Sequence, residues 1–366
     1  MGQFSGSPTR YGQRQEAAMA RVGDGRRATL EEVAREAKVS RATVSRVVNG
    51  SPNVDAAMAR RVRAAAEKLN YIPNLAARSL MTQRTDTVAL IASESQDRVF
   101  GDPFFASVLR GVSQGLSGSG WRLMLLMVST DDEVRDATRY LLGGHVDGAM
   151  LISEHGGHPI AAPLIEAGVP VVIGGRPMDP AVRAPYVDHN NIGGAELAAR
   201  HLRSLGRQRI ATISGPQDMS AGVDRLTGFV RCLGPDYDPT LVEAGDFTTQ
   251  SGSDAMSRLL ERAPDIDAVF AASDLMALGA LQTLRRAGRR VPEDLALVGY
   301  DDIGVAADAV PPLTTIRQET TEQGRRMAEL LTRTIHGRAR TDGIPSEQAG
   351  PEGIILPVEL VIRETA

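Results

Sequence analysis

Residues 29–49 read TLEEVAREAKVSRATVSRVVN, and this stretch predicts a helix, a tight turn and a second helix. Thr29 and Glu32 have the spacing of a capping box, in which a hydroxyl and a carboxylate satisfy the amides that open a helix. Apolar side chains recur at helical spacing in both halves of the stretch, at Leu30, Val33, Ala34 and Ala37 and again at Val44, Val47 and Val48. We therefore expect a small helical unit with one buried face on each helix.

The outward face of the second helix has the chemistry of a DNA-reading surface. Ser40 is placed to cap this helix, and five residues then point away from its apolar stripe, namely Arg41, Ala42, Thr43, Ser45 and Arg46. In a major groove the first turn of such a helix meets base edges, while Ser45, Arg46 and Asn49 can reach phosphates. Taken alone, the geometry also fits an ordinary antiparallel helix pair.

The residues that follow decide between these two readings. A third helix is expected over residues 55–69, with Val62, Ala65, Ala66 and Leu69 on one face. The stretch SRATVSRVVNG at 40–50, followed by LNYIPNLAARSL at 69–80, closely resembles the DNA-binding headpiece and hinge of the lactose and galactose repressor (LacI/GalR) family. The resemblance implies a helix-turn-helix headpiece that binds duplex DNA.

The same resemblance implies a role for the segment after the third helix. Residues 74–80 correspond to a hinge helix that orders on the operator, and Leu80 to the leucine that wedges between base pairs in the minor groove. The alternative is a plain linker with an incidental leucine. Arg41 and Ala42 differ from the lactose repressor at its most operator-selective positions, so we expect a different operator. Further DNA contacts implied by the resemblance are Leu30, Asn53, Tyr71, Asn74 and Ala77.

Charge is divided unevenly along the 366 residues, which are too many for one ordinary core. Residues 1–85 hold 15 Lys and Arg against 7 Asp and Glu, a net charge of +8, which leaves −12 for residues 86–366 in a chain of −4. A basic segment is the electrostatic footprint of phosphate binding. The single cysteine excludes an internal disulfide, and we find neither a signal peptide nor a bilayer-spanning run, so we expect a cytoplasmic, nucleoid-associated protein.

After residue 86 the chain alternates short β-branched runs with amphipathic helical patterns, which predicts parallel sheets with helices on both faces. The expected strands are 88–93, 123–128, 148–152, 169–173, 186–188, 209–213, 268–272, 295–299 and 356–362. The expected helices are 105–116, 133–142, 192–205, 226–233, 254–260, 275–287 and 322–335. So many strands exceed one compact sheet, which favours two similar α/β lobes.

We therefore expect an all-α helix-turn-helix headpiece followed by an α/β sensor of two doubly wound parallel-sheet lobes, like a periplasmic binding protein. The expected divisions are a disordered arm over 1–28, the headpiece over 29–73, the hinge helix and linker over 74–85, and a ligand-binding and dimerisation domain over 86–366. Within that domain we assign about 86–188 and 318–340 to an N-lobe, and about 189–317 and 353–366 to a C-lobe.

Ligands of open parallel sheets bind beyond the carboxyl ends of the strands, and those ends become polar or aromatic in this chain. Three of its seven phenylalanines lie at Phe100, Phe104 and Phe105, of which Phe105 is equally compatible with core packing. Ser273 and Asp274 can also serve as a helix cap. The remaining candidates from the strand ends are Ser93, Asp102, Arg176, Asp188 and Asp301, and the family resemblance adds Asp224 and Arg225.

The second half of the chain carries further resemblance to the same family, in AASDLMALGA at 271–280, VGYDD at 298–302 and PLTTI at 312–316. It implies a small effector between the lobes, held by an acid at Asp301 and an aromatic ring at Phe247. Both groups suit a sugar, because a carboxylate accepts paired hydroxyls and a ring packs on the C–H face of a pyranose. Residues 98–105 and 215–229 are similar to members that sense cello-oligosaccharides or related glycosides.

Three positions depart from the family pattern. Lys38 stands at the turn where glycine is usual, which would require a left-handed backbone. Val223 stands where several sugar-binding relatives have an arginine, with Asp224 and Arg225 beside it, so a polyol-clamping arrangement is in doubt. Ser273 replaces an asparagine of some relatives.

Enzyme signatures are missing from the sequence. It has no phosphate-binding loop, no H-E-x-x-H and no G-x-S-x-G, and His155 and His158 lack a third metal ligand nearby. We expect no cofactor, no metal and no membrane partner. The predicted function is that of a homodimeric, ligand-responsive repressor; a purine-type corepressed regulator and a freestanding sugar-binding protein remain as alternatives.

Replacing Leu80 with alanine should weaken operator binding and reduce operator bending while leaving effector affinity unchanged, because the variant loses only the apolar wedge. Mobility-shift phasing measures the bend, and calorimetry measures the effector affinity. Equal bending by the variant would refute the wedge role.

Overall fold

The computed structural model describes residues 28–48, 54–72, 84–156, 160–340 and 353–366. The chain divides into two compact units, Met1–Arg84 and Thr85–Ala366, and each is described by itself. The expected arm up to residue 27 and the expected hinge helix lie outside the described residues. So do five predicted DNA contacts, Asn49, Asn53, Asn74, Ala77 and Leu80.

The first unit contains the predicted helices α2 (Leu30–Ala37), α3 (Arg41–Val48) and α4 (Ala56–Lys68). The capping box is confirmed, since the Thr29 hydroxyl accepts from the Glu32 amide at 3.3 Å and the Glu32 carboxylate accepts from the Thr29 amide at 2.7 Å. The three helices enclose a small core of Val33, Ala34, Ala37, Val44, Val62 and Ala65. Val47 and Val48, expected in the buried stripe, pack against this core but stay partly exposed.

The turn between α2 and α3 shows how the sequence tolerates a lysine in place of glycine. Lys38 adopts the left-handed conformation, with φ of 53° and ψ of 48°. Such a conformation costs a non-glycine residue roughly 1–2 kcal/mol. The guanidinium of Arg61 on α4 donates to the carbonyl oxygens of Ala37 (2.5 Å) and Lys38 (3.0 Å), which satisfies two carbonyls at the end of α2.

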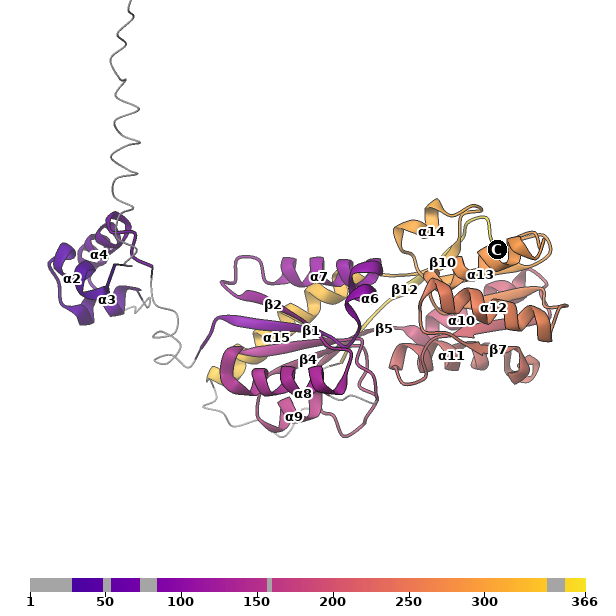
Figure 1. Ribbon diagram of the computed structural model, residues 1–366, viewed down its shortest axis with the longest axis horizontal. Helices are drawn as coiled ribbons and strands as arrows, with labels where there is room; N and C mark the ends of the chain where they lie inside the picture. The colour runs from indigo at the N-terminus through magenta and orange to yellow at the C-terminus, as the bar shows by residue number, and fades with distance from the viewer. Residues whose placement is uncertain (1–27, 49–53, 73–83, 157–159, 341–352) are drawn as a thin grey trace, which may run out of the picture. The chain divides into compact units, whose positions relative to one another are not determined.

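The second unit is built from two six-stranded sheets, one in each lobe (Figure 1). The first sheet has the order β11-β5-β4-β3-β1-β2. Its strands are β1 (Thr87–Ala92), β2 (Arg122–Met127), β3 (Gly148–Ile152), β4 (Val171–Gly174), β5 (Tyr186–His189) and β11 (Gly353–Leu356). The second sheet has the order β12-β10-β9-β8-β6-β7. Its strands are β6 (Ile210–Ser214), β7 (Val242–Ala244), β8 (Ala268–Ala271), β9 (Ala296–Asp301), β10 (Thr314–Gln318) and β12 (Val358–Val361).

Helices cover both faces of each sheet, as the alternation predicted (Figure 1). In β1, Val88 and Leu90 face one helical layer while Ala89 and Ile91 face the other, since successive side chains alternate across a strand. The helices of the first lobe are α6 (Gln96–Gly101), α7 (Pro103–Gly115), α8 (Asp131–Tyr140), α9 (Ala161–Glu166) and α15 (Thr320–Arg340). Those of the second are α10 (Asn191–Ser204), α11 (Ser220–Leu233), α12 (Thr249–Arg262), α13 (Asp274–Arg286) and α14 (Gly304–Asp308).

The chain crosses between the sheets three times, between β5 and α10, between β10 and α15, and between β11 and β12. The third crossing corrects the sequence analysis, which expected one strand over 356–362 and placed all of 353–366 in the C-lobe. Residues 353–356 instead pair with β5 in the first sheet, and only 358–361 pair with β10 in the second. Pro357 stands between them and has no N–H to continue a ladder.

Five short elements were not predicted from the sequence, namely β7 (Val242–Ala244), β10 (Thr314–Gln318), α6 (Gln96–Gly101), α9 (Ala161–Glu166) and α14 (Gly304–Asp308). β7 has only three residues, and β10 reads TTIRQ, in which Ile316 is the one apolar side chain, so neither has the apolar pattern of a strand. Of these elements β10 matters most, because the chain passes from this strand into the second crossing.

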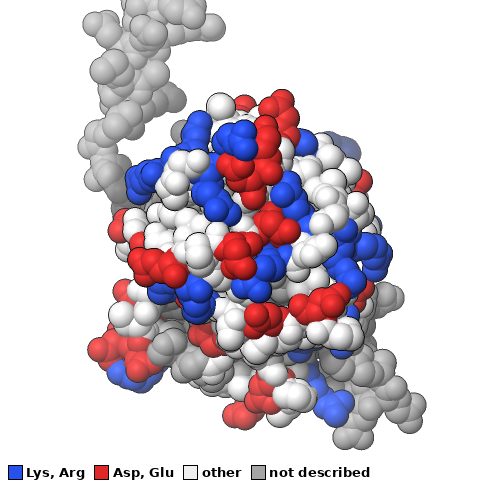
Figure 2. Space-filling view, turned by 90° about the vertical axis from the view of Figure 1, so that its right-hand side faces the viewer, with Lys and Arg blue, Asp and Glu red and all other residues white. Residues whose placement is uncertain are grey.

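The surface at the end of the second lobe carries mixed charge. Figure 2 shows acidic and basic side chains interspersed over this face, with no continuous basic field in view. A surface of this kind is suited to solubility rather than to tracking phosphates. The excess of positive charge found in residues 1–85 therefore keeps the first unit as the candidate DNA-binding part.

Two helices of the first lobe pack unusually closely. A β-carbon added at Gly111 of α7 would lie 1.9 Å from the carbonyl oxygen of Thr321, in α15. On α15, a β-carbon at Gly324 would lie 2.2 Å from the carbonyl oxygen of Val108. These contacts are with backbone, so no side-chain rotation can relieve them. The α7–α15 contact fixes the start of the helix that follows the second crossing.

Replacing Gly111 with alanine should therefore lower the free energy of unfolding by about 1–3 kcal/mol, the usual cost of overpacking. Thermal unfolding followed by circular dichroism measures the change. Gly337→Ala is the matched control on α15, because a β-carbon there meets no atom within 4 Å. The control should be neutral or slightly stabilising. An unchanged midpoint in the Gly111 variant would show that α7 and α15 can separate at little cost.

Candidate DNA-reading helix and effector cleft

The start of α3 presents the surface expected for reading DNA. The Ser40 hydroxyl accepts from the Thr43 amide at 3.1 Å, so the helix is capped where predicted. Arg41, Ala42 and Arg46 are exposed, while Thr43 and Ser45 are half-buried. Arg41 pairs with Glu31 of α2 at 3.1 Å in an exposed contact that a phosphate or a base edge can replace at small cost.

Two other predicted DNA contacts have a structural role in the first unit. Leu30 and Tyr71 both pack partly against the headpiece core. Burial, with a smaller contribution from the charge of Glu31, raises the pKa of the Tyr71 phenol. Their partial exposure leaves a DNA contact possible, and it stays a prediction.

The second unit holds a cleft of two adjoining chambers between the lobes. The larger chamber has a volume of about 390 Å³ and the smaller about 70 Å³. They share lining residues that include Phe104, Arg225 and Gln318. The loops that form them leave the carboxyl ends of strands in both sheets, where ligands of open parallel sheets bind. A volume of 390 Å³ lies within the roughly 300–1,000 Å³ typical of small-molecule sites.

Arg225 on α11 is the buried centre of this cleft, with 5% of its surface exposed. Its guanidinium donates to the side-chain oxygens of Asn191 (2.9 Å), Asp301 (3.3 Å) and Gln318 (3.3 Å). It also donates to the carbonyl oxygen of Ala272 at 2.6 Å and lies 3.6 Å from the ring centroid of Tyr300. Asn191 and Gln318 stand at two of the three lobe crossings, so this one side chain links the cleft to both.

Asp301 and Phe247, the two effector residues that the family resemblance implied, both line the smaller chamber. Asp301 accepts from the Gln318 amide at 2.6 Å, and burial raises the pKa of its carboxyl to about 7, although Arg225 opposes the shift. The Phe247 ring lies 5.6 Å from the guanidinium of Arg225 and 5.9 Å from that of Arg98. Phe247, Asp301 and Ser153 all line the cleft with positive φ, and strained backbone of this kind gathers at functional sites.

Arg176 and Asp224, two further predicted residues, form an ion pair between the lobes. Arg176 follows β4 and donates to both carboxylate oxygens of Asp224 on α11, at 2.7 and 3.3 Å. Its amide donates to Asp188 at 3.1 Å, at the end of β5. Asp188 is buried and also accepts from the backbone amide of His189 and the side-chain amide of Asn191. Burial raises the pKa of its carboxyl to about 6.

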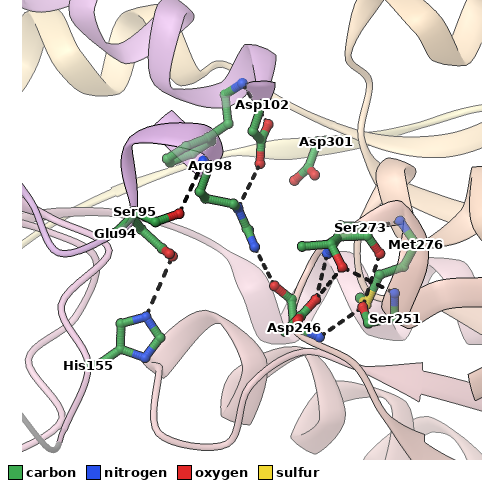
Figure 3. Close-up of polar contacts among 12 residues, drawn as sticks. Glu94, Ser95, Arg98, Asp102, His155, Asp246, Ser251, Ser273, Met276 and Asp301 are labelled. Carbon is green, nitrogen blue, oxygen red and sulfur yellow. Dashed lines mark hydrogen bonds and ion pairs between the residues drawn. The ribbon is translucent and has the colours of Figure 1, made fainter. Parts of the chain in front are cut away.

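Two more polar contacts bridge the lobes beside the cleft, and Figure 3 shows the one that Arg98 makes. Arg98 on α6 lies 3.6 Å from Asp102 and donates at 2.5 Å to the carbonyl oxygen of Asp246 in the second lobe. His155 follows β3 and lies 3.5 Å from Glu94 of its own lobe and 2.8 Å from Asp218 of the other. The hydrogen bond to Glu94, supported by Asp218 against the effect of burial, raises the pKa of His155 to about 9.

Not every predicted effector residue reaches the two chambers. Phe104 lines both, and Phe105 lines the smaller one while also packing in the core. Phe100, expected as a wall, is 74% exposed and lines neither. Ser93 lines neither and donates its amide to the Ile152 carbonyl at 3.1 Å.

Ser273 and Asp274 have the capping and scaffold role that the sequence left open. The Ser273 hydroxyl accepts from the Met276 amide at 3.2 Å at the start of α13. Asp274 is fully buried and accepts from the Thr315 hydroxyl (2.5 Å) and the Ile303 amide (2.9 Å). Burial and the nearby charge of Asp301 raise the pKa of Asp274 well above its usual value. Neither residue lines the two chambers.

The structure places an arginine in the cleft even though Val223 stands where several sugar-binding relatives have one. Val223 leaves no gap in the site, because Arg225 reaches Asp301 and Phe247 from two positions further along α11. Sequence reasoning missed Asn191, Gln318, His155, His189 and Gln323, all of which line the cleft. A strand-end position was the only available signal for most of them, and β10 itself was missed.

The described residues contain no cluster of three or more histidine, cysteine or acidic side chains able to hold a metal ion. Within the same part of the chain, no helix has the length and apolarity needed to cross a membrane.

Family models match parts of both units. A model of bacterial regulatory proteins of the lacI family matches residues 29–74, and a model of the periplasmic binding protein-like domain matches residues 199–366. The HTH-type transcriptional regulator CelR of Thermobifida fusca is 50% identical over 344 residues, which cover 93% of this chain and 98% of CelR. The HTH-type transcriptional repressor CytR of Escherichia coli strain K12 is 33% identical over 342 residues, covering 92% of this chain and 95% of CytR.

Solved structures give the same result. A complex of the transcriptional regulator CelR with cellobiose matches with a TM-score of 0.73 and 48% identity, covering 93% of this chain and all of that one. A lac repressor dimer bound to operator and the anti-inducer ONPF matches with a TM-score of 0.77 and 28% identity, covering 93% and 99%. The headpiece and the two-lobed body define a DNA-binding transcriptional regulator with a ligand-sensing domain. The chain belongs to the lacI family of bacterial regulatory proteins.

The bridge through His155 makes stability depend on pH. A folded-state pKa of about 9 lies above the ordinary value of 6.5, so the charged bridge contributes fully below pH 6.5 and is lost as the pH rises through 9. We therefore expect the thermal midpoint of the wild type to fall between pH 6.5 and 9 more steeply than that of His155→Gln.

A matched control is His145→Gln, because His145 stacks on Tyr140 with ring centroids 4.4 Å apart and has no carboxylate partner among the described residues. This variant should keep the wild-type pH slope. Identical slopes in the wild type and in His155→Gln would mean that the bridge does not form in solution.

Proposed function

We propose that this chain is a repressor that binds a pseudopalindromic operator as a homodimer and is released when a cello-oligosaccharide enters the cleft. One observation carries the proposal: a buried arginine in the cleft holds both the expected sugar-binding carboxylate and two of the lobe crossings. The similarity to CelR, whose solved complex contains cellobiose, supports the choice of sugar. A target on DNA places the work of the protein in the cytoplasm, at the nucleoid.

The cleft has the chemistry that a glucoside requires. The Asp301 carboxylate can accept hydroxyl hydrogens, and the Arg225 guanidinium can donate to hydroxyl oxygens. The Phe247 ring offers an apolar face for sugar C–H groups once the neighbouring guanidinium of Arg98 moves aside. We therefore assign sugar binding to Asp301, Arg225 and Phe247, with Asp102, Phe104 and Asp188 around them.

Release from the operator requires that the sugar bind one arrangement of the lobes better than another, because a ligand with equal affinity for both shifts nothing. The sugar competes for the partners that Arg225 holds, and these include Asn191 and Gln318 at the crossings. It also meets three contacts between lobes, those of Arg176, Arg98 and His155. A tenfold loss of operator affinity needs about 1.4 kcal/mol of such coupling.

Operator recognition is assigned to the headpiece. Ser40, Arg41 and Ala42 at the start of α3 would read base edges in each half-site, with Thr43, Ser45 and Arg46 near phosphates. The solved lac repressor that this chain resembles is a dimer on its operator.

Replacing Asp301 with alanine should abolish release by cellobiose while leaving basal operator binding intact, since Asp301 lies in the second unit and serves the effector. The experiment first selects an inverted-repeat site from random duplexes, and then measures operator affinity with and without cellobiose. We expect at least a tenfold loss of affinity in the wild type and less than a twofold change in the variant.

A matched control is Asp294→Ala, a half-buried carboxylate that pairs with Arg290 outside the cleft. It should respond like the wild type. Tighter operator binding with a purine and no effect of cellobiose would favour the corepressed alternative. If cellobiose releases Asp301→Ala from the operator as it releases the wild type, Asp301 does not bind the sugar.

A further inference from the structure

Two residues that line the larger chamber each have a buried polar side-chain atom with no hydrogen-bond partner among the described residues. These atoms are Nε2 of His189, at the end of β5, and Oε1 of Gln323, on the first turn of α15. Each residue is only 4% exposed, and both line the 390 Å³ chamber. An unpaired buried polar atom is destabilising, so such atoms are rare unless a bound group satisfies them.

The orientation of Gln323 leaves an acceptor available. Its side-chain nitrogen donates to the carbonyl oxygen of Val187 at 2.9 Å. A carbonyl can only accept, so the amide cannot turn over without losing this bond, and Oε1 is fixed as the free end. The group that completes Gln323 must therefore be a donor.

His189 is held neutral beside it. Burial, reinforced by the charge of Arg225, lowers the pKa of His189 to about 4. A neutral imidazole has one donor and one acceptor nitrogen, so Nε2 pairs with a hydroxyl and has no charge to attract an anion. An amide oxygen and a neutral imidazole together fit the hydroxyls of an uncharged polyol.

The two chambers differ in chemistry. The smaller chamber contains the charged pair of Arg225 and Asp301 and the Phe247 ring. The larger one adds the neutral groups of His189 and Gln323, and the two are continuous through Phe104, Arg225 and Gln318. A ligand of two linked rings can occupy both, whereas a single ring held at Asp301 does not require the larger chamber.

We propose that His189 and Gln323 form a second glycosyl subsite that determines the preference for a glucose disaccharide over glucose. The inference rests on the proposed function, because it assumes that the first ring binds at Asp301 and Arg225. The second ring donates a hydroxyl hydrogen to Gln323 Oε1 and shares a hydrogen bond with His189 Nε2. The subsite therefore reads the length of the effector.

The test measures calorimetric affinity of the full chain for cellobiose and for glucose. Gln323→Met and His189→Phe remove the hydrogen-bonding atoms with little change in volume. Each should weaken cellobiose binding about tenfold, the cost of an unpaired hydroxyl at a buried site, and leave glucose binding unchanged. His189→Gln has a hydrogen-bonding side chain that His189→Phe lacks, so it should recover part of the affinity for cellobiose.

His201→Phe is the matched control, because His201 also has a buried unpaired Nε2 but does not line either chamber. It should bind both sugars like the wild type. Because His189→Phe can fail to fold, circular dichroism accompanies each variant, and Gln323→Met decides the result on its own if His189→Phe is unfolded.

Three outcomes would overturn the subsite. Gln323→Met and His189→Phe can bind cellobiose normally, or they can lose cellobiose and glucose by equal factors. In both cases the wild type still binds cellobiose and leaves the operator, so the proposed function survives. A wild type that does not bind cellobiose at all refutes the proposed function and the subsite together.

Discussion

The organisation of the sensing unit depends on the burial of one guanidinium, that of Arg225. An ion buried this deeply is tolerated only when its donors are paired, and removing a partner from a buried pair costs several kcal/mol. Its partners come from the effector chamber, at Asp301, and from two lobe crossings, at Asn191 and Gln318. Occupation of the chamber therefore acts directly on the segments that set the relation between the lobes.

The surrounding contacts explain why such a change can pass between the lobes. The ion pair of Arg176 with Asp224 joins the loop after β4 to α11, and the His155 bridge joins the loop after β3 to the loop before α11. Phe247 and Asp301 hold positive φ angles that cost free energy and persist only because neighbours enforce them. A site assembled from strained loops and paired charges has discrete arrangements, and a ligand can select one of them.

Much of the architecture followed from local sequence. The capping box at Thr29, the left-handed Lys38 and the alternation of strands and helices are properties of short segments, and they were predicted. Of the residues that line the cleft, only some were predicted. Arg225 was named, but its role was in doubt because the packing of α11, and not the sequence, decides which of its residues faces the cleft. Gln318 and Gln323 were missed because their partners, Arg225 and Val187, are distant in sequence.

The most direct measurement is the ratio of operator affinities with and without cellobiose in Arg225→Lys, which keeps the charge but loses the planar fork that bridges Asn191, Asp301 and Gln318. Arg231→Lys, at an exposed position of α11, is the control. The ratio should be tenfold or more in the wild type and in the control, and close to one in Arg225→Lys with operator affinity retained. If cellobiose lowers the operator affinity of Arg225→Lys as much as that of the wild type, Arg225 does not couple the cleft to the operator.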